Sequence, residues 1–179
     1  MKKFSKWFAV LALALGIGMV GCTSLPSSDT MYSTTCAIGV ATGMVANGTD
    51  IDDASRNAIC DIMNEVSQCI PETNQTFSAA WTPIAKAHAD SLVADGKITA
   101  EQGVLVMKAF DIVVSGIDYV FEVRYPKAKQ YKELVSAAVD GFTDGFLSVF
   151  KQVDGALSSG RSVTFDIDAY EWLKKNAVK

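Results

Sequence analysis

The fold is decided by residues 100–124, which read AEQGVLVMKAFDIVVSGIDYVFEVR. Polar side chains recur in this stretch at steps of three and four, the spacing of one helix face: Lys108, Asp111, Ser115, Asp118 and Glu122. Most of the remaining surface of such a helix is apolar, from Val104 to Phe121. A helix with so narrow a polar stripe is predicted to lie at the centre of a helical bundle, buried on most sides.

Two further helices are expected between residues 30 and 70. The first covers residues 30–47 and ends at Gly48. The second begins at Asp50 or Asp52, because acidic residues favour the positive end of the helix dipole, and it stops before Pro71. The two helices are predicted to form an antiparallel hairpin that turns at Gly48.

The segment over residues 76–94 is predicted to contain a break. Thr82 precedes Pro83, and a threonine N-cap followed by proline at the first helical position is a favoured helix start. Thr99 and Gln102 can then form a capping box at the start of the central helix.

A long amphipathic helix is expected after Pro126, ending at about Val153, with Tyr131 on its inward face. Residues 163–167 alternate in the manner of an extended segment, and Asp168 is predicted to cap a short terminal helix. The sequence thus predicts an all-α bundle of five or six helices. In this interpretation residues 31–157 form the bundle, and residues 158–179 pack on it.

The N-terminus has the composition of a secretory signal. Lys2, Lys3 and Lys6 precede an uncharged apolar run over residues 7–20, which is the arrangement of a basic n-region followed by an h-region. This run is shorter than the roughly 20 residues that cross a bilayer core. A permanent transmembrane helix is therefore not expected.

The four residues Met19, Val20, Gly21 and Cys22 follow this run. They resemble the lipobox of bacterial lipoproteins, although Met19 stands where leucine is usual. The resemblance implies that residues 1–21 are removed as a signal peptide. It also implies that the Cys22 thiol carries diacylglycerol and that the new amino terminus carries a further acyl chain. Such multiple acylation holds a protein stably on its membrane.

The alternative is an ordinary secretory signal, cut near Ser24 or Ser27. In lipoproteins, an aspartate directly after the acylated cysteine resembles a signal for retention in the inner membrane. This chain has Thr23 at that position. We therefore expect the protein to be anchored at the periplasmic face of the outer membrane. Residues 22–30 are expected to form a lipidated tether, whose eight residues after the cysteine reach only about 27 Å.

The mature chain is acidic. Removal of the three lysines before residue 22 leaves 13 basic and 20 acidic side chains, a net charge of −7. Because an acidic domain repels phosphate backbones, we expect no nucleic-acid partner. We also expect no polybasic patch that would bind anionic lipid headgroups.

Three features could carry chemistry, but each has a simpler structural interpretation. Residues 95–99 resemble the middle of an EF-hand calcium loop, yet Ser91 and Gln102 occupy the end positions where carboxylates are needed. Asp140 and Asp144 could share a metal or act as an acid and base, but no further ligand accompanies them. They are interpreted as solvated residues beside core phenylalanines, with neighbouring glycines easing helix contact.

His88, the one histidine of the chain, is the third feature. It is expected to be partly buried and hydrogen-bonded, since no nucleophile motif accompanies it. The sequence therefore predicts no catalytic, cofactor-binding or metal site. Gly39 and Gly43 stand four residues apart, a spacing predicted to serve close helix packing within the chain.

Cys36, Cys60 and Cys69 remain after lipidation of Cys22. In the predicted hairpin Cys36 faces Cys60, so we expect a disulfide between them in the oxidising envelope. Cys69 is expected to be a free thiol at the edge of the apolar stripe. The alternative is three reduced cysteines that act as small apolar residues.

For function, the sequence favours a membrane-anchored, non-enzymatic helical module that binds a protein partner. It would act as a scaffold, assembly helper, inhibitor or exclusion factor. The alternative is a bundle that encloses an apolar ligand or lipid, with Phe142, Phe146 and Phe150 around it. A third hypothesis is an enzyme. An exposed apolar patch would favour the protein partner, and a cavity lined by these phenylalanines would favour the ligand.

Overall fold

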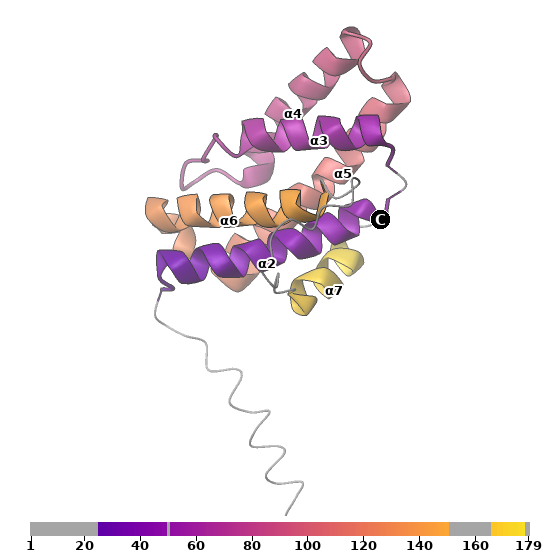
Figure 1. Ribbon diagram of the computed structural model, residues 1–179. Coiled ribbons are helices and arrows are strands. Elements are labelled where there is room, and N and C mark those ends of the chain that lie inside the picture. Colours follow the sequence, from indigo (N-terminus) through magenta and orange to yellow (C-terminus); the bar gives the residue numbers. More distant parts are fainter. Residues whose placement is uncertain (1–24, 50, 151–165, 178–179) are drawn as a thin grey trace, which may run out of the picture.

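The computed structural model describes residues 25–49, 51–150 and 166–177. Within these residues the chain is all-α, which confirms the predicted bundle of five or six helices. Its helices are α2 (Ser28–Asn47), α3 (Asp53–Val66), α4 (Phe77–Ala94), α5 (Ala100–Asp118), α6 (Lys132–Phe150) and α7 (Ile167–Asn176), as Figure 1 shows. A π-helix, η2 (Tyr119–Arg124), extends α5, and a 3-10 turn, η3 (Ala128–Gln130), precedes α6. The signal peptide, Cys22 and most of the expected extended segment lie outside the described residues.

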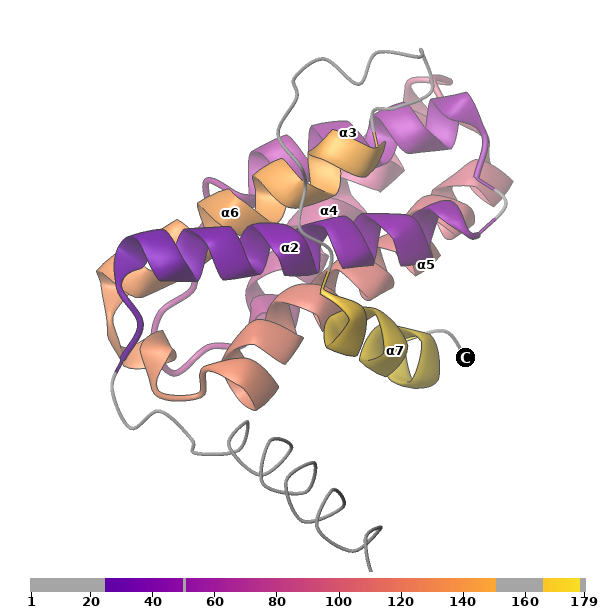
Figure 2. The same ribbon diagram turned by 60° about the horizontal axis from the view of Figure 1, so that its bottom comes forward.

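The helices α2 and α6 lie side by side and run parallel (Figures 1 and 2). A Cβ atom at Gly43 would lie 3.1 Å from the carbonyl oxygen of Phe146, and one at Gly145 would lie 2.8 Å from the carbonyl carbon of Cys36. A Cβ at Gly39 would overlap the backbone of α6 in the same way. Close packing of Gly39 and Gly43 within the chain is therefore confirmed.

The central position predicted for residues 100–124 holds for most of their length. Val106, Phe110, Val113 and Ile117 are completely buried, and α5 contacts α2, α3, α4 and α7. The expectation fails at the first turns of α5. Val104 is 58 % exposed there, because it lies four residues before Lys108 and thus on the same face of α5 as the polar stripe.

The predicted break at Thr82 is wrong. Helix α4 is continuous from Phe77 and contains Pro83, and its N-cap is Thr76, whose side chain accepts a hydrogen bond from the backbone N–H of Ala79 at 3.1 Å. Phe77 and Trp81 are buried in the core. Burial of these two rings outweighs the helix hydrogen bond lost at the proline.

Two helix starts and one inward position also need correction. Helix α2 starts at Ser28, capped by Ser27, so the last residues of the expected tether are helical. The cap of α7 is Asp166 rather than Asp168, since its carboxylate accepts the N–H of Ala169 at 2.9 Å. Tyr131, predicted to face inward, is 48 % exposed.

The predicted hairpin of the first two helices is wrong, and with it the expected disulfide. Asp52 does cap α3, but α3 ends at Val66, so Cys69 lies beyond the helix and is exposed. Helix α2 packs on α6 instead of pairing with α3. Cys36 lies against Gly145 and is a free thiol, so no bridge to Cys60 is formed.

Candidate functional site

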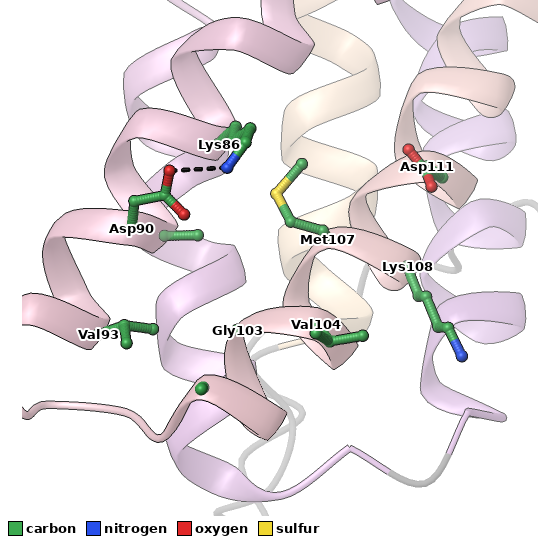
Figure 3. A pocket seen from close by; sticks show the side chains of 10 residues that line it. Lys86, Asp90, Val93, Gly103, Val104, Met107, Lys108 and Asp111 are labelled. Atoms are coloured by element: carbon green, nitrogen blue, oxygen red, sulfur yellow. Dashed lines mark hydrogen bonds and ion pairs between the residues drawn. The ribbon is translucent and has the colours of Figure 1, made fainter.

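A groove of about 410 Å³ lies between α4 and α5, on the hairpin that these helices form. Figure 3 shows its two walls, with Met107 on α5 directed toward α4. Its apolar lining includes Ala89, Val93, Val104 and Met107. Its charged lining residues are Lys86, Asp90, Lys108 and Asp111. Apolar surface flanked by charges of both signs is the composition of a binding surface.

Local sequence rules build the hairpin that carries the groove. Gly96 adopts a φ of 70° in the turn after α4, a conformation that glycine tolerates without strain. Helix α5 then starts with the predicted capping box, in which Gln102 N–H donates to the Thr99 hydroxyl and the Gln102 side chain accepts from Thr99 N–H. Gly103 leaves room for the Val93 side chain, since a Cβ there would lie 3.0 Å from Val93 Cγ2.

The groove combines a buried base with an exposed edge. Ala89 is 2 % exposed, whereas Val104 is 58 % exposed. Lys86 and Asp90 form an ion pair of 2.8 Å on the α4 wall. On the α5 wall, partial burial raises the pKa of the Asp111 carboxyl. The described residues that line the groove are small or aliphatic side chains, one methionine, two lysines and two aspartates.

Sequence reasoning assigned Val104, Leu105 and Met107 to the core of the bundle. Apolar residues at helical spacing have the same pattern whether another helix covers them or not. The charged residues Lys108 and Asp111 lie on the same helix and were the one local sign that this part of α5 reaches solvent.

His88 lies outside the groove, on the face that α4 turns toward α3. Its Nδ1 atom is 2.5 Å from a carboxylate oxygen of Glu65, and its side chain is 27 % exposed. This position matches the expected histidine that is partly buried and hydrogen-bonded. Neither His88 nor Glu65 lines the groove.

The aspartate pair on α6 is exposed, as the simpler interpretation predicted. Asp140 is solvated, and Asp144 accepts a hydrogen bond of 2.5 Å from the hydroxyl of Tyr32 on α2. Phe142 and Phe146 beside them are completely buried. The neighbouring glycines face α2 and permit the close contact of the two helices.

The turn at residues 95–99 has the structure of a helix connection. The Asp95 carboxylate forms an ion pair of 3.4 Å with Lys97, instead of joining a second carboxylate around a calcium ion. Gln102, at the position of the missing calcium ligand, is used in the capping box. Across the described ranges, no group of three or more histidine, cysteine, aspartate or glutamate side chains could hold a metal ion.

Asp118 belongs to the polar stripe of α5 but is not fully solvated. It is half-buried at the N-terminus of α4, where the backbone N–H of Phe77 donates to its carboxylate. Burial, with a smaller effect from the charge of Glu122, raises its pKa to about 6, although Lys129 and the Phe77 hydrogen bond act in the opposite direction.

Comparisons with known protein families, curated proteins and solved structures gave no match for this chain. Function must therefore be inferred from the residues and their arrangement. In the part of the chain that the structure describes, no helix has the length and apolarity of a membrane span. Cys22 precedes the described residues, so its lipidation stays a prediction from the lipobox.

Proposed function

We propose that this protein is a lipid-anchored envelope protein whose helical bundle binds a protein partner in the α4–α5 groove, without catalysing a reaction. The groove carries this proposal. It presents Val104 at 58 % exposure, next to the partly buried Val93 and Met107. A contiguous exposed apolar surface with a polar edge is typical of sites where proteins bind one another.

The arrangement of the groove suits an amphipathic helix as the bound element. Two antiparallel helices form its walls, and a third helix can place its apolar stripe between them. Lys86 and Asp90 lie on one wall, and Lys108 and Asp111 lie on the other. A partner helix with charges of both signs beside its apolar stripe would therefore fit. A scaffold, an assembly helper, an inhibitor and an exclusion factor would each use such a contact.

The position of the groove agrees with an anchor at Cys22. Ser28 starts α2 and follows Cys22 by six residues, so about 20 Å of chain at most joins the lipid to the bundle. Val104 and Asp118 are about 21 Å apart along α5, and the Asp118 end is the one near the start of α2. The α4–α5 hairpin lies far from the start of α2 (Figure 1), so the proposed anchor would leave the groove directed away from the membrane.

The packing of the interior supports a protein partner over an enclosed apolar ligand. Phe142, Phe146 and Phe150 are completely buried. The rings of Phe146 and Phe150 stack with their centroids 4.7 Å apart. Phe146 and Phe150 thus pack on each other, and none of the three side chains lines the groove.

Site-specific photo-crosslinking in intact envelopes tests the proposal. A photoreactive residue at Lys108 should give a discrete adduct with one protein. Val104→Asp should abolish this adduct, because the carboxylate would be desolvated against the apolar lining. Ile167→Asp is the matched control, since Ile167 is 62 % exposed on α7 and lies outside the groove. An adduct that persists in Val104→Asp would contradict binding in the groove.

A further inference from the structure

Positive charge is concentrated in one short segment of this acidic chain. Arg124, Lys127, Lys129 and Lys132 are four of the 13 basic residues that follow residue 21. Residues 122–133 contain only two acids, so this segment carries a net charge of +2. The rest of the mature chain, with nine basic and 18 acidic residues, carries −9. The expectation that no basic cluster is present therefore needs correction, and we call these four residues the basic end.

The cations of the basic end are available for binding. Arg124, Lys127 and Lys132 are exposed, while Lys129 is half-buried and faces Asp118. Within the described parts of the chain, ion pairs occur elsewhere and none involves these four side chains. The exposed charges of Arg124, Lys127 and Lys132 are thus not neutralised by a contacting carboxylate.

The basic end lies at the same end of the bundle as the start of α2. Helices α2 and α6 run parallel, so their first residues are neighbours (Figures 1 and 2). The hydroxyl groups of Tyr125 and Thr34 are 3.5 Å apart, which places the segment after η2 beside the first half of α2. The short chain from Cys22 to Ser28 brings this end of the molecule to the membrane.

Exposed apolar and aromatic side chains accompany the cations. Leu25 is 38 % exposed, Val123 is 50 % exposed and Tyr131 is 48 % exposed, and all three lie at this end. Tyrosine is enriched at membrane interfaces because its ring is apolar and its hydroxyl is polar. Lysine side chains can lay their apolar stems along such a surface while the ammonium group contacts a phosphate.

We propose that the basic end rests on anionic phospholipid headgroups, so that the anchored domain stands on its membrane in one orientation with the groove directed outward. This proposal rests on the lipid anchor at Cys22 inferred above. A cluster of cations next to a membrane attachment point is drawn to anionic lipid. The short tether keeps the basic end and the lipid headgroups close together, at a high effective concentration.

Fluorescence quenching in reconstituted vesicles tests this orientation. Protein purified from membranes carries Tyr131→Trp, and the parent protein gives the background from its own tryptophans. Vesicles contain brominated phosphatidylcholine, alone or with phosphatidylglycerol. Quenching at position 131 should increase when phosphatidylglycerol is present. Leu105→Trp, on the groove hairpin, should show no quenching in either vesicle.

Charge-removing variants supply the matched comparison. Lys127→Gln with Lys132→Gln should lose the part of the quenching that depends on phosphatidylglycerol. Lys174→Gln with Lys175→Gln removes the same charge from the exposed end of α7 and should leave the quenching unchanged. Equal losses in the two double variants, or quenching that does not depend on anionic lipid, would overturn the proposed orientation.

The mass of the N-terminal peptide separates this proposal from the proposed anchor. An acylated preparation without lipid-dependent quenching would overturn the orientation alone. A preparation without acyl chains on Cys22 would overturn the anchor and, with it, the orientation that depends on it.

Discussion

Replacing Gly145 by alanine tests the contact that holds α2 and α6 together. A Cβ atom at this position would lie 2.8 Å from the carbonyl carbon and 3.0 Å from the Cα atom of Cys36, and it would overlap the Cys36 oxygen. These atoms belong to the backbone of a helix, so no side-chain rotation relieves the overlap. The two helices must move apart, which loosens the packing of Phe142 and Phe146 on the same face.

The expected loss of stability follows from two opposing effects. Inserting a methyl group into a closely packed contact costs about 1–3 kcal/mol, and a rigid backbone neighbour favours the upper end of that range. Alanine is better than glycine in a helix by about 1 kcal/mol, which offsets part of the cost. We expect Gly145→Ala to lower the free energy of unfolding by about 2 kcal/mol. For a domain of this size, such a loss lowers the Tm by about 4–8 °C.

Thermal unfolding followed by far-ultraviolet circular dichroism measures the effect. Gly103→Ala is the matched control, because a Cβ at that helical position meets only the Cγ2 atom of Val93, at 3.0 Å. Its Tm should stay within a degree or two of the parent value, since the valine side chain can adjust. A Gly145→Ala protein that melts with or above Gly103→Ala would refute the close parallel contact of α2 and α6.

Three further changes have defined outcomes. Cys22→Ser should abolish incorporation of a radiolabelled fatty acid, and label retained in the variant would contradict the lipobox. Phe110→Ala removes a completely buried ring and should cost about 3–5 kcal/mol in urea unfolding; a melting temperature within a degree or two of the parent would show that α5 is not the core. Asp118→Asn removes a carboxyl whose pKa is raised to about 6. Because the folded state binds this proton more tightly than the unfolded chain, the parent should gain stability relative to the variant as the pH falls from 7 to 4. Equal stability differences at both pH values would contradict a half-buried Asp118.

The elements that sequence analysis predicted well depend on local rules. Asp52 caps α3, and Thr99 with Gln102 forms the capping box of α5, because an N-cap needs only a side chain within three residues of its partner. The helical character of residues 100–124 likewise follows from spacing along a single segment.

The pairing of helices depends on contacts between distant residues, and it was predicted wrongly. Two helices that are adjacent in the sequence suggested a hairpin, and the expected bridge from Cys36 to Cys60 followed from it. The parallel pair of α2 and α6 joins residues about 100 positions apart. The glycine pairs on both helices were the signal for this contact, since two faces without side chains can approach most closely.

The candidate site was also missed, for a related reason. Val104 lies four residues before Lys108, in line with the polar stripe of α5, and is exposed, whereas Phe110 lies on a covered face and is completely buried. Pro83 indicated a break by local rules, but the burial of Phe77 and Trp81 keeps α4 continuous. The basic end was overlooked because the net charge of the whole chain is negative.

Co-purification from intact envelopes tests the central claim most directly. The anchored protein, Val104→Asp and Ile167→Asp are compared by quantitative mass spectrometry after mild crosslinking. We expect one envelope protein to be enriched with the parent and with Ile167→Asp, and to be lost with Val104→Asp. The same set of proteins at the same abundance with all three would contradict partner binding in the α4–α5 groove.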